Sequence, residues 1–120
     1  MRRQPKYNLF KNSSYALKGL ADIIKNETSF KIELFLLIPV IFIIYFMDID
    51  LTQKLILFVS YFLVLVGEAA NSAIERVVDL VTLDHHEMAG KAKDAGSTVV
   101  FLLVIQAIAV WCCIIYQQYT

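Results

Sequence analysis

Apolar residues in this chain gather in three long runs that polar stretches separate. The first run includes "LFLLIPVIFIIYFM", the second ends in a mixed segment, and the third carries no charged residue. A helix needs about 20 predominantly apolar residues to cross the hydrocarbon core of a bilayer. The pattern therefore predicts transmembrane helices over about 30–48, 55–80 and 95–117, with Pro39 inside the first of them.

The segment before the first run, at about 7–28, mixes apolar and basic positions. Apolar side chains recur at helical spacing on one face, as Leu17, Leu20, Ala21 and Ile24. Lysines recur every seven residues on another face, as Lys11, Lys18 and Lys25. This pattern is typical of an amphipathic helix that lies at a membrane surface. We therefore expect an all-α membrane protein with one surface helix ahead of three transmembrane helices.

Composition favours a membrane protein over a soluble one. Hydrophobic residues make up 58% of the 120 residues and charged residues 18%, against about 45–50% and 25% in soluble domains. A chain of this length favours one domain, here 1–120. The formal net charge is zero, so no overall field attracts nucleic acid, and we expect no nucleic-acid partner.

Positive charges lie unevenly along the chain and predict its orientation. Seven of the eleven Lys and Arg residues fall within the first 31 positions: Arg2, Arg3, Lys6, Lys11, Lys18, Lys25 and Lys31. The polar segment 82–94, a loop or the end of a helix, holds two more, whereas the 48–54 turn holds only Lys54. Because positively charged loops stay on the cytoplasmic side, we expect the N-terminus and segment 82–94 in the cytoplasm and the C-terminus outside.

Polar residues interrupt the second apolar run in an ordered way, within "LVGEAANSAIERVVDL" at 65–80. On an α-helix the polar positions of this stretch share one face: Glu68, Asn71, Ser72, Glu75 and Asp79. At about 1.5 Å rise per residue, Glu68 lies roughly 20 Å from the outer end of this run and Glu75 roughly 30 Å, which is about the thickness of the hydrocarbon core. We expect Glu68 inside the membrane, Glu75 at its cytoplasmic boundary and Asp79 in water.

A carboxylate at the depth of Glu68 is costly unless it is paired or faces a cavity. One interpretation is structural, with a neutral Glu68 in an interhelical hydrogen bond. The other is chemical: Glu68 can act as a general base, and Glu75 near water can hold Mg²⁺ together with substrate phosphates. Asn71 lies between them and can orient either. This arrangement favours a reaction between a membrane-dissolved alcohol and a magnesium nucleotide.

Two motifs together carry a family resemblance. "EAANSAIERVVDL" followed by "HHEMAGKAKDAGS" closely resembles the prokaryotic integral-membrane diacylglycerol kinase family. The similarity covers nearly the whole chain, including "KGL" at 18–20 and "NE" at 26–27, and its most specific part is E-x-x-N-S-A-I-E-x-x-V-D. The resemblance implies a homotrimer of three-span subunits in the bacterial inner membrane, with the C-terminus in the periplasm. It also implies phosphorylation of diacylglycerol to phosphatidic acid with ATP and Mg²⁺.

The resemblance also implies residue roles. Glu68 matches the general base, and Glu27 and Glu75 match the magnesium ligands that meet the nucleotide. Further positions match nucleotide contacts: Tyr15, His86, Lys93 and Asp94. Three others match lipid-site positions: Lys54, Ser97 and Trp111. The Walker A pattern G-x-x-x-x-G-K-[ST] and the protein-kinase signatures are absent from the sequence, but phosphoryl transfer rests on positioning and charge neutralisation rather than on one fold.

Two positions depart from the family pattern, and the family itself holds two activities. Asn8 stands where a basic residue is expected, and Leu17 where an aromatic one is expected. The family includes enzymes that phosphorylate undecaprenol, but "AGKAKDAGSTV", in which Gly96 and Ser97 follow the aspartate, looks more like the diacylglycerol kinases.

Two functions outside kinase chemistry stay open at this stage. A small proton-coupled transporter that uses Glu68 as its carrier explains one buried glutamate but leaves Glu75 and Asp79 without a role. A structural or assembly subunit would bury polar residues only for association.

Overall fold

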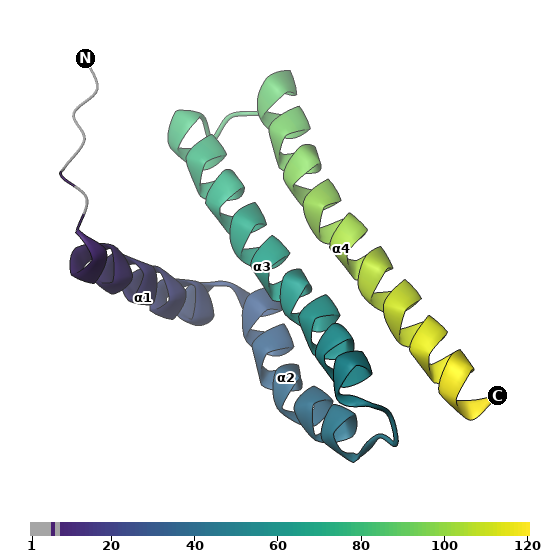
Figure 1. Cartoon of the computed structure of the whole chain (residues 1–120). Helices are drawn as coiled ribbons and strands as arrows, with labels where there is room; N and C mark the ends of the chain where they lie inside the picture. The colour runs from purple at the N-terminus through teal and green to yellow at the C-terminus, as the bar shows by residue number, and fades with distance from the viewer. Residues whose placement is uncertain (1–5, 7) are drawn as a thin grey trace.

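The computed structural model describes residue 6 and residues 8–120, and this part of the chain is all-helical. Figure 1 shows its helices in chain order: α1 (Leu9–Asn26), α2 (Thr28–Phe46), α3 (Leu51–Val81) and α4 (Glu87–Tyr119). The last three are each long and apolar enough to cross a membrane. The all-α fold and the prediction of three helices able to span a membrane are confirmed. Arg2, Arg3 and Tyr7, which entered the charge count and the expected surface helix, lie outside the described residues.

Helix α1 begins at a side-chain cap and extends away from the bundle (Figure 1). The amide oxygen of Asn8 accepts a hydrogen bond from the backbone N–H of Lys11 at 3.1 Å, which satisfies one of the free donors at a helix N-terminus. This gives Asn8 a structural role at a position where the family pattern has a basic residue. None of the residues of α1, Leu9–Asn26, is buried, so burial does little to hold this helix in place.

One non-helical residue, Glu27, joins α1 to α2. Its backbone is extended, with φ −109° and ψ 106°. Its N–H still donates to the carbonyl of Ile23 at 2.8 Å, and its carbonyl accepts from the N–H of Lys31 at 3.1 Å. The chain therefore changes direction here without leaving a polar backbone group of Glu27 unpaired.

The turn from α2 to α3 is capped on both sides. Asp50 and Gln53 form a reciprocal capping box, in which each side chain accepts from the backbone N–H of the other, at 2.8 and 3.2 Å. Such a box fixes the start of a helix. Close to this turn a small apolar core joins three helices: Ile44, Leu57 and Ile114. Pro39 lies inside α2, which continues through it to Phe46.

Helices α3 and α4 run side by side over most of their length, and α2 packs against α3 near the turn (Figure 1). Two glycines permit the close approach of α3 and α4. A methyl group on Gly67 would meet the side chain of Leu103, and one on Gly96 would meet Asn71 and Ile74. The side chain of Gln106 donates to the backbone carbonyl of Ser60 at 2.7 Å. Small residues and interhelical hydrogen bonds are the usual means by which membrane helices associate.

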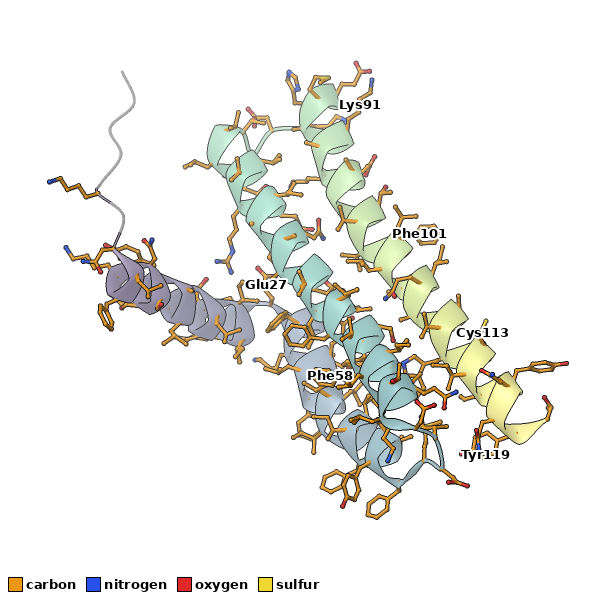
Figure 2. All side chains as sticks on the ribbon, viewed as in Figure 1. Glu27, Phe58, Lys91, Phe101, Cys113 and Tyr119 are labelled. Carbon is orange, nitrogen blue, oxygen red and sulfur yellow. The ribbon has the colours of Figure 1, made fainter. Side chains whose placement is uncertain are left out.

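Many large apolar side chains cover the outside of the bundle, as Figure 2 shows along α4 at Phe101. Phe35, Phe42 and Phe101 are all more than half exposed. In water such a surface would be unstable, whereas lipid tails or apolar partner surfaces can cover it. Residues 87–94, for which a loop and a helix end both stood open, are helical.

Candidate active site

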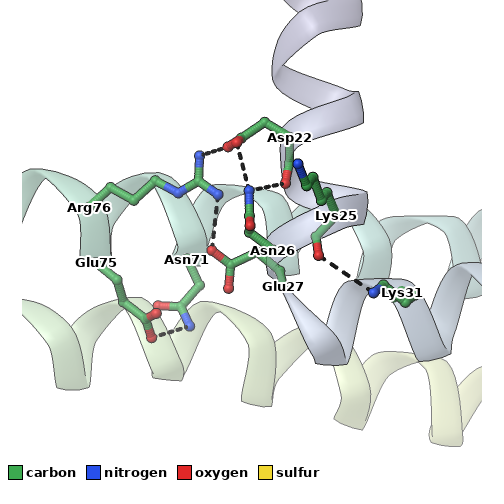
Figure 3. A network of polar contacts seen from close by, with 8 residues as sticks. All are labelled: Asp22, Lys25, Asn26, Glu27, Lys31, Asn71, Glu75 and Arg76. Carbon is green, nitrogen blue, oxygen red and sulfur yellow. Dashed lines mark hydrogen bonds and ion pairs between the residues drawn. The ribbon is translucent and has the colours of Figure 1, made fainter.

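Polar side chains of α3 meet the end of α1 in one network, which Figure 3 shows from close by. Asn71 donates from its amide nitrogen to Oε1 of Glu75 at 3.2 Å. Arg76, the next residue, pairs through Nη2 with Oε1 of Glu27 at 3.1 Å and through Nη1 with the carboxylate of Asp22. The network therefore brings Glu27 and Glu75, far apart in sequence, to the same part of the molecule.

Helical geometry explains why α3 can present these groups together. Positions 68, 71 and 75 are separated by three and four residues, so they lie on one face of the helix. All three side chains are half-buried, whereas Asp79, one turn further on, is exposed. The amide oxygen of Asn71 is buried and has no hydrogen-bond partner among the described residues. This oxygen faces Gly96 of α4, so the close packing of α3 against α4 leaves it without a partner.

Glu68 faces a second carboxyl group that the sequence did not single out. Glu33 on α2 lies close to Glu68, and its Oε2 atom is buried with no hydrogen-bond partner among the described residues. The hydroxyl of Tyr61 donates to the backbone carbonyl of Glu33 at 2.5 Å, which joins α3 to α2 beside the pair.

A second polar site lies at the α3–α4 connection. Lys93 on α4 pairs with Asp79 on α3 at 2.7 Å. His86 caps α4, since its Nδ1 accepts from the backbone N–H of Met88 at 3.1 Å. A cavity of about 260 Å³ lies beside these side chains, and Asp84 and His85 also line it. The structure thus groups His86 and Lys93, both expected to contact a nucleotide, around one cavity that opens beside the polar end of α3.

The remaining expected site residues are more dispersed. Asp94 and Ser97 are exposed near the start of α4. Tyr15 is exposed on α1, with the Lys18 ammonium 6.0 Å from its ring centroid. Lys54 donates to the carbonyl of Tyr45 at 2.9 Å at the α2–α3 turn.

Trp111 packs against the apolar core near the turn where Lys54 lies. Ser97 and Trp111 are 14 residues apart on one helix, or roughly 21 Å, so this chain does not bring Lys54 and Trp111 together with Ser97.

Sequence reasoning missed three residues that the structure places in these networks: Asp22, Glu33 and Arg76. Glu33 gives one signal, that of a charged residue at the edge of an apolar run. Asp22 and Arg76 give none, because nothing in one sequence says which residue α1 brings to α3. Among the described residues, no three His, Cys, Asp or Glu side chains cluster as a metal-binding group would.

Comparison with known proteins gives a consistent result. The family model described as "Prokaryotic diacylglycerol kinase" matches residues 14–115. The diacylglycerol kinase of Escherichia coli strain K12 is 34% identical over 111 residues, which are 92% of this chain and 91% of that protein. That of Haemophilus influenzae is 36% identical over 104 residues, 87% of this chain and 88% of the relative. That of Pseudomonas aeruginosa is 28% identical over 103 residues, 86% and 84% of the two chains.

Proposed function

The chain belongs to the prokaryotic diacylglycerol kinase family, and from that premise we propose that it transfers the γ-phosphoryl group of ATP to diacylglycerol and forms phosphatidic acid. The observation that carries the proposal is the arrangement of four carboxyl groups. Glu68 lies close to Glu33 of α2, Glu75 lies two turns further along α3, and Glu27 reaches the same network from the α1–α2 junction. A lipid hydroxyl would approach Glu68, and the nucleotide would approach Glu75 and Glu27.

Glu68 is the proposed general base. Its carboxylate accepts the proton of the lipid hydroxyl while that oxygen attacks the γ-phosphorus, and the bond from the γ-phosphorus to the β–γ bridging oxygen breaks to release ADP. Glu33 is placed to share the proton that Glu68 receives, because their carboxyl groups lie close to each other. General-base assistance of this kind contributes about 10²–10⁴ in rate.

Glu27 and Glu75 are the proposed holders of Mg²⁺, and their chemistry fits that ion. Mg²⁺ takes oxygen ligands and is bound by one or two carboxylates together with substrate phosphates, rather than by a full protein cage. The carboxylates of Glu27 and Glu75, which the polar network brings to the same part of the molecule, meet this description. When bound, Mg²⁺ neutralises negative charge on the transferring phosphoryl group. Asn71 orients Glu75 through the hydrogen bond from its amide nitrogen.

The nucleotide would lie between this network and the cavity at the α3–α4 connection. Lys93 is half-buried there and carries a positive charge that suits a phosphate, and His86 lies at the wall of the same cavity. Asp94 and Tyr15 complete the proposed nucleotide contacts. Lys93 can leave Asp79 for a phosphate at little cost, because both side chains of this ion pair are nearly half exposed and such pairs contribute little.

The proposal places the site at the cytoplasmic surface of a bacterial inner membrane. Residues 1–120 form one domain, α1 lies along the membrane surface with its lysines toward the headgroups, and the C-terminus is periplasmic. Ser97 contacts the lipid headgroup, whereas Lys54 and Trp111 contact lipid at the opposite end of the spans. A homotrimer would cover part of the exposed apolar surface of α3 and α4, and chemical cross-linking in micelles would count its subunits.

The test is a head-to-head kinase assay with purified full-length protein in mixed micelles. Mg-ATP is supplied with diacylglycerol in one arm and with undecaprenol in the other. Faster phosphatidate formation supports the proposal. A clear preference for undecaprenol makes this chain an undecaprenol kinase of the same fold and catalytic layout. No phosphorylation of either alcohol overturns the kinase assignment.

A further inference from the structure

Arg76 is the one basic side chain of α3 that lies inside the proposed magnesium site. It follows Glu75 directly in the sequence, and its Nη2 atom lies 3.1 Å from Oε1 of Glu27. Its Nη1 atom pairs with Asp22 of α1 (Figure 3). A guanidinium group is therefore in contact with one of the two proposed magnesium ligands and is attached next to the other.

A positive charge in this position opposes a second cation. Mg²⁺ at Glu27 and Glu75 would lie within a few ångströms of Arg76, and like charges at such separations repel even in a high dielectric. Arg76 also uses one of the two carboxylate oxygens of Glu27. The side chains of Arg76 and Glu27 are 44% and 29% exposed, so water screens this repulsion without removing it.

Asp22 is an alternative ion-pair partner for Arg76. The Asp22 carboxylate already contacts Arg76, and the amide of Asn26 donates to the same carboxylate at 2.7 Å. Arg76 therefore stays paired with α1 when it releases Glu27. The cost of breaking the pair with Glu27 is small because exposed ion pairs contribute little, so metal binding can drive the exchange.

We propose that Arg76 competes with the divalent cation for Glu27, and that Asp22 holds Arg76 when the cation takes that carboxylate. This inference rests on the proposed metal-holding role of Glu27 and Glu75. In this arrangement Arg76 sets the metal concentration at which the site fills, and Asp22 lowers that concentration by giving the guanidinium another partner.

The experiment measures Mn²⁺ binding to the full chain in micelles, with no nucleotide and no lipid substrate, from the electron paramagnetic resonance signal of free Mn²⁺. Removing the competitor in Arg76→Gln should tighten binding about three- to tenfold. Asp22→Asn should weaken it about two- to fivefold, since Arg76 then has only Glu27. In the double variant the Asp22 effect should disappear, because its route through Arg76 is gone.

Two comparisons make the outcome specific. Lys91→Gln removes one positive charge from the exposed pair that Lys91 makes with Glu87, and it should leave Mn²⁺ binding within about twofold if proximity to Glu27 matters rather than net charge. Unchanged or weaker binding in Arg76→Gln overturns the inference, as does an Asp22 effect that persists in the double variant. Glu27→Gln that binds Mn²⁺ as tightly as wild type overturns the proposed metal site itself, and this outcome is distinct from a failure of the inference about Arg76.

Discussion

Glu33 on α2 and Glu68 on α3, 35 positions apart in the sequence, lie close to each other. Their contact is the polar meeting point of two helices whose neighbouring residues are mostly apolar, and it lies beside the bond from Tyr61 to the Glu33 carbonyl. A polar pair between membrane helices can hold them together. It can also keep a carboxyl group ready for proton transfer, and the two roles respond differently to substitution.

Replacing Glu68 by Gln should lower kcat at least about 100-fold, since the base is lost and general-base catalysis contributes about 10²–10⁴. Glu33→Gln keeps a side chain that can hydrogen-bond Glu68, so it should lose about tenfold or less. The measurement is kcat at saturating diacylglycerol and Mg-ATP in mixed micelles. If Glu68→Gln keeps more than about a third of wild-type activity, Glu68 is not the base.

A methyl group at Gly96 should damage the site through packing. It would meet the Asn71 amide oxygen and Ile74, and a turn of Asn71 would break its 3.2 Å bond to Glu75. Overpacking of this kind costs about 1–3 kcal/mol, and we expect activity to fall with it. Gly90→Ala is the stability control, because nothing lies within 4 Å of its added carbon, and it should gain up to about 1 kcal/mol from helix propensity. Equal unfolding midpoints for the two variants would contradict this account.

Lys93→Met should raise the KM for Mg-ATP about tenfold, which equals about 1.4 kcal/mol of lost phosphate interaction. Its stability should change little, since the pair with Asp79 is exposed and contributes about 0–1 kcal/mol. Asp79→Asn keeps the ammonium group and should leave the KM within about twofold. Initial rates over a range of nucleotide concentrations measure both. A loss confined to kcat in Lys93→Met would mean that the lysine does not hold the nucleotide in the ground state.

Gln106→Leu tests an interhelical bond away from the chemistry. Gln106 donates to the carbonyls of Ser60 and Leu103, at 2.7 and 2.8 Å. Interhelical hydrogen bonds in membranes contribute about 0.6 kcal/mol on average and up to about 2 kcal/mol. The free energy of unfolding, measured in sodium dodecyl sulfate, should fall by that amount. The folded variant should keep its activity. Lost activity with unchanged resistance would assign Gln106 a role in the reaction.

The three spans and the polar face of α3 could be read from the sequence because both are local patterns. Apolar runs set span lengths, and spacings of three and four residues place Glu68, Asn71 and Glu75 on one face. Contacts between helices have no such signal. The pairing of Glu33 with Glu68, of Lys93 with Asp79, and of Arg76 with Asp22 and Glu27 depends on how helices pack. A single sequence does not state that packing.

The structure suggests one rule for sequences of this kind. Glu33 lies at the edge of an apolar run, and Glu68 lies within one. Ionisable groups inside a membrane are rare, and each needs a partner. Matching the carboxyl groups of different apolar runs with one another therefore predicts the Glu33–Glu68 pair from the sequence. No comparable rule would have found Asp22, since α1 is almost wholly exposed and its acidic residue resembles any solvated charge.

The single extended residue between α1 and α2 has a mechanical consequence. Glu27 is one of the proposed metal ligands. Its backbone N–H and carbonyl are both hydrogen-bonded, so the connection between the two helices is short and constrained. If α1 lies on the bilayer surface as proposed, any tilt of α1 moves the Glu27 carboxylate with it. The geometry of the proposed metal site would then depend on the angle between α1 and the membrane plane.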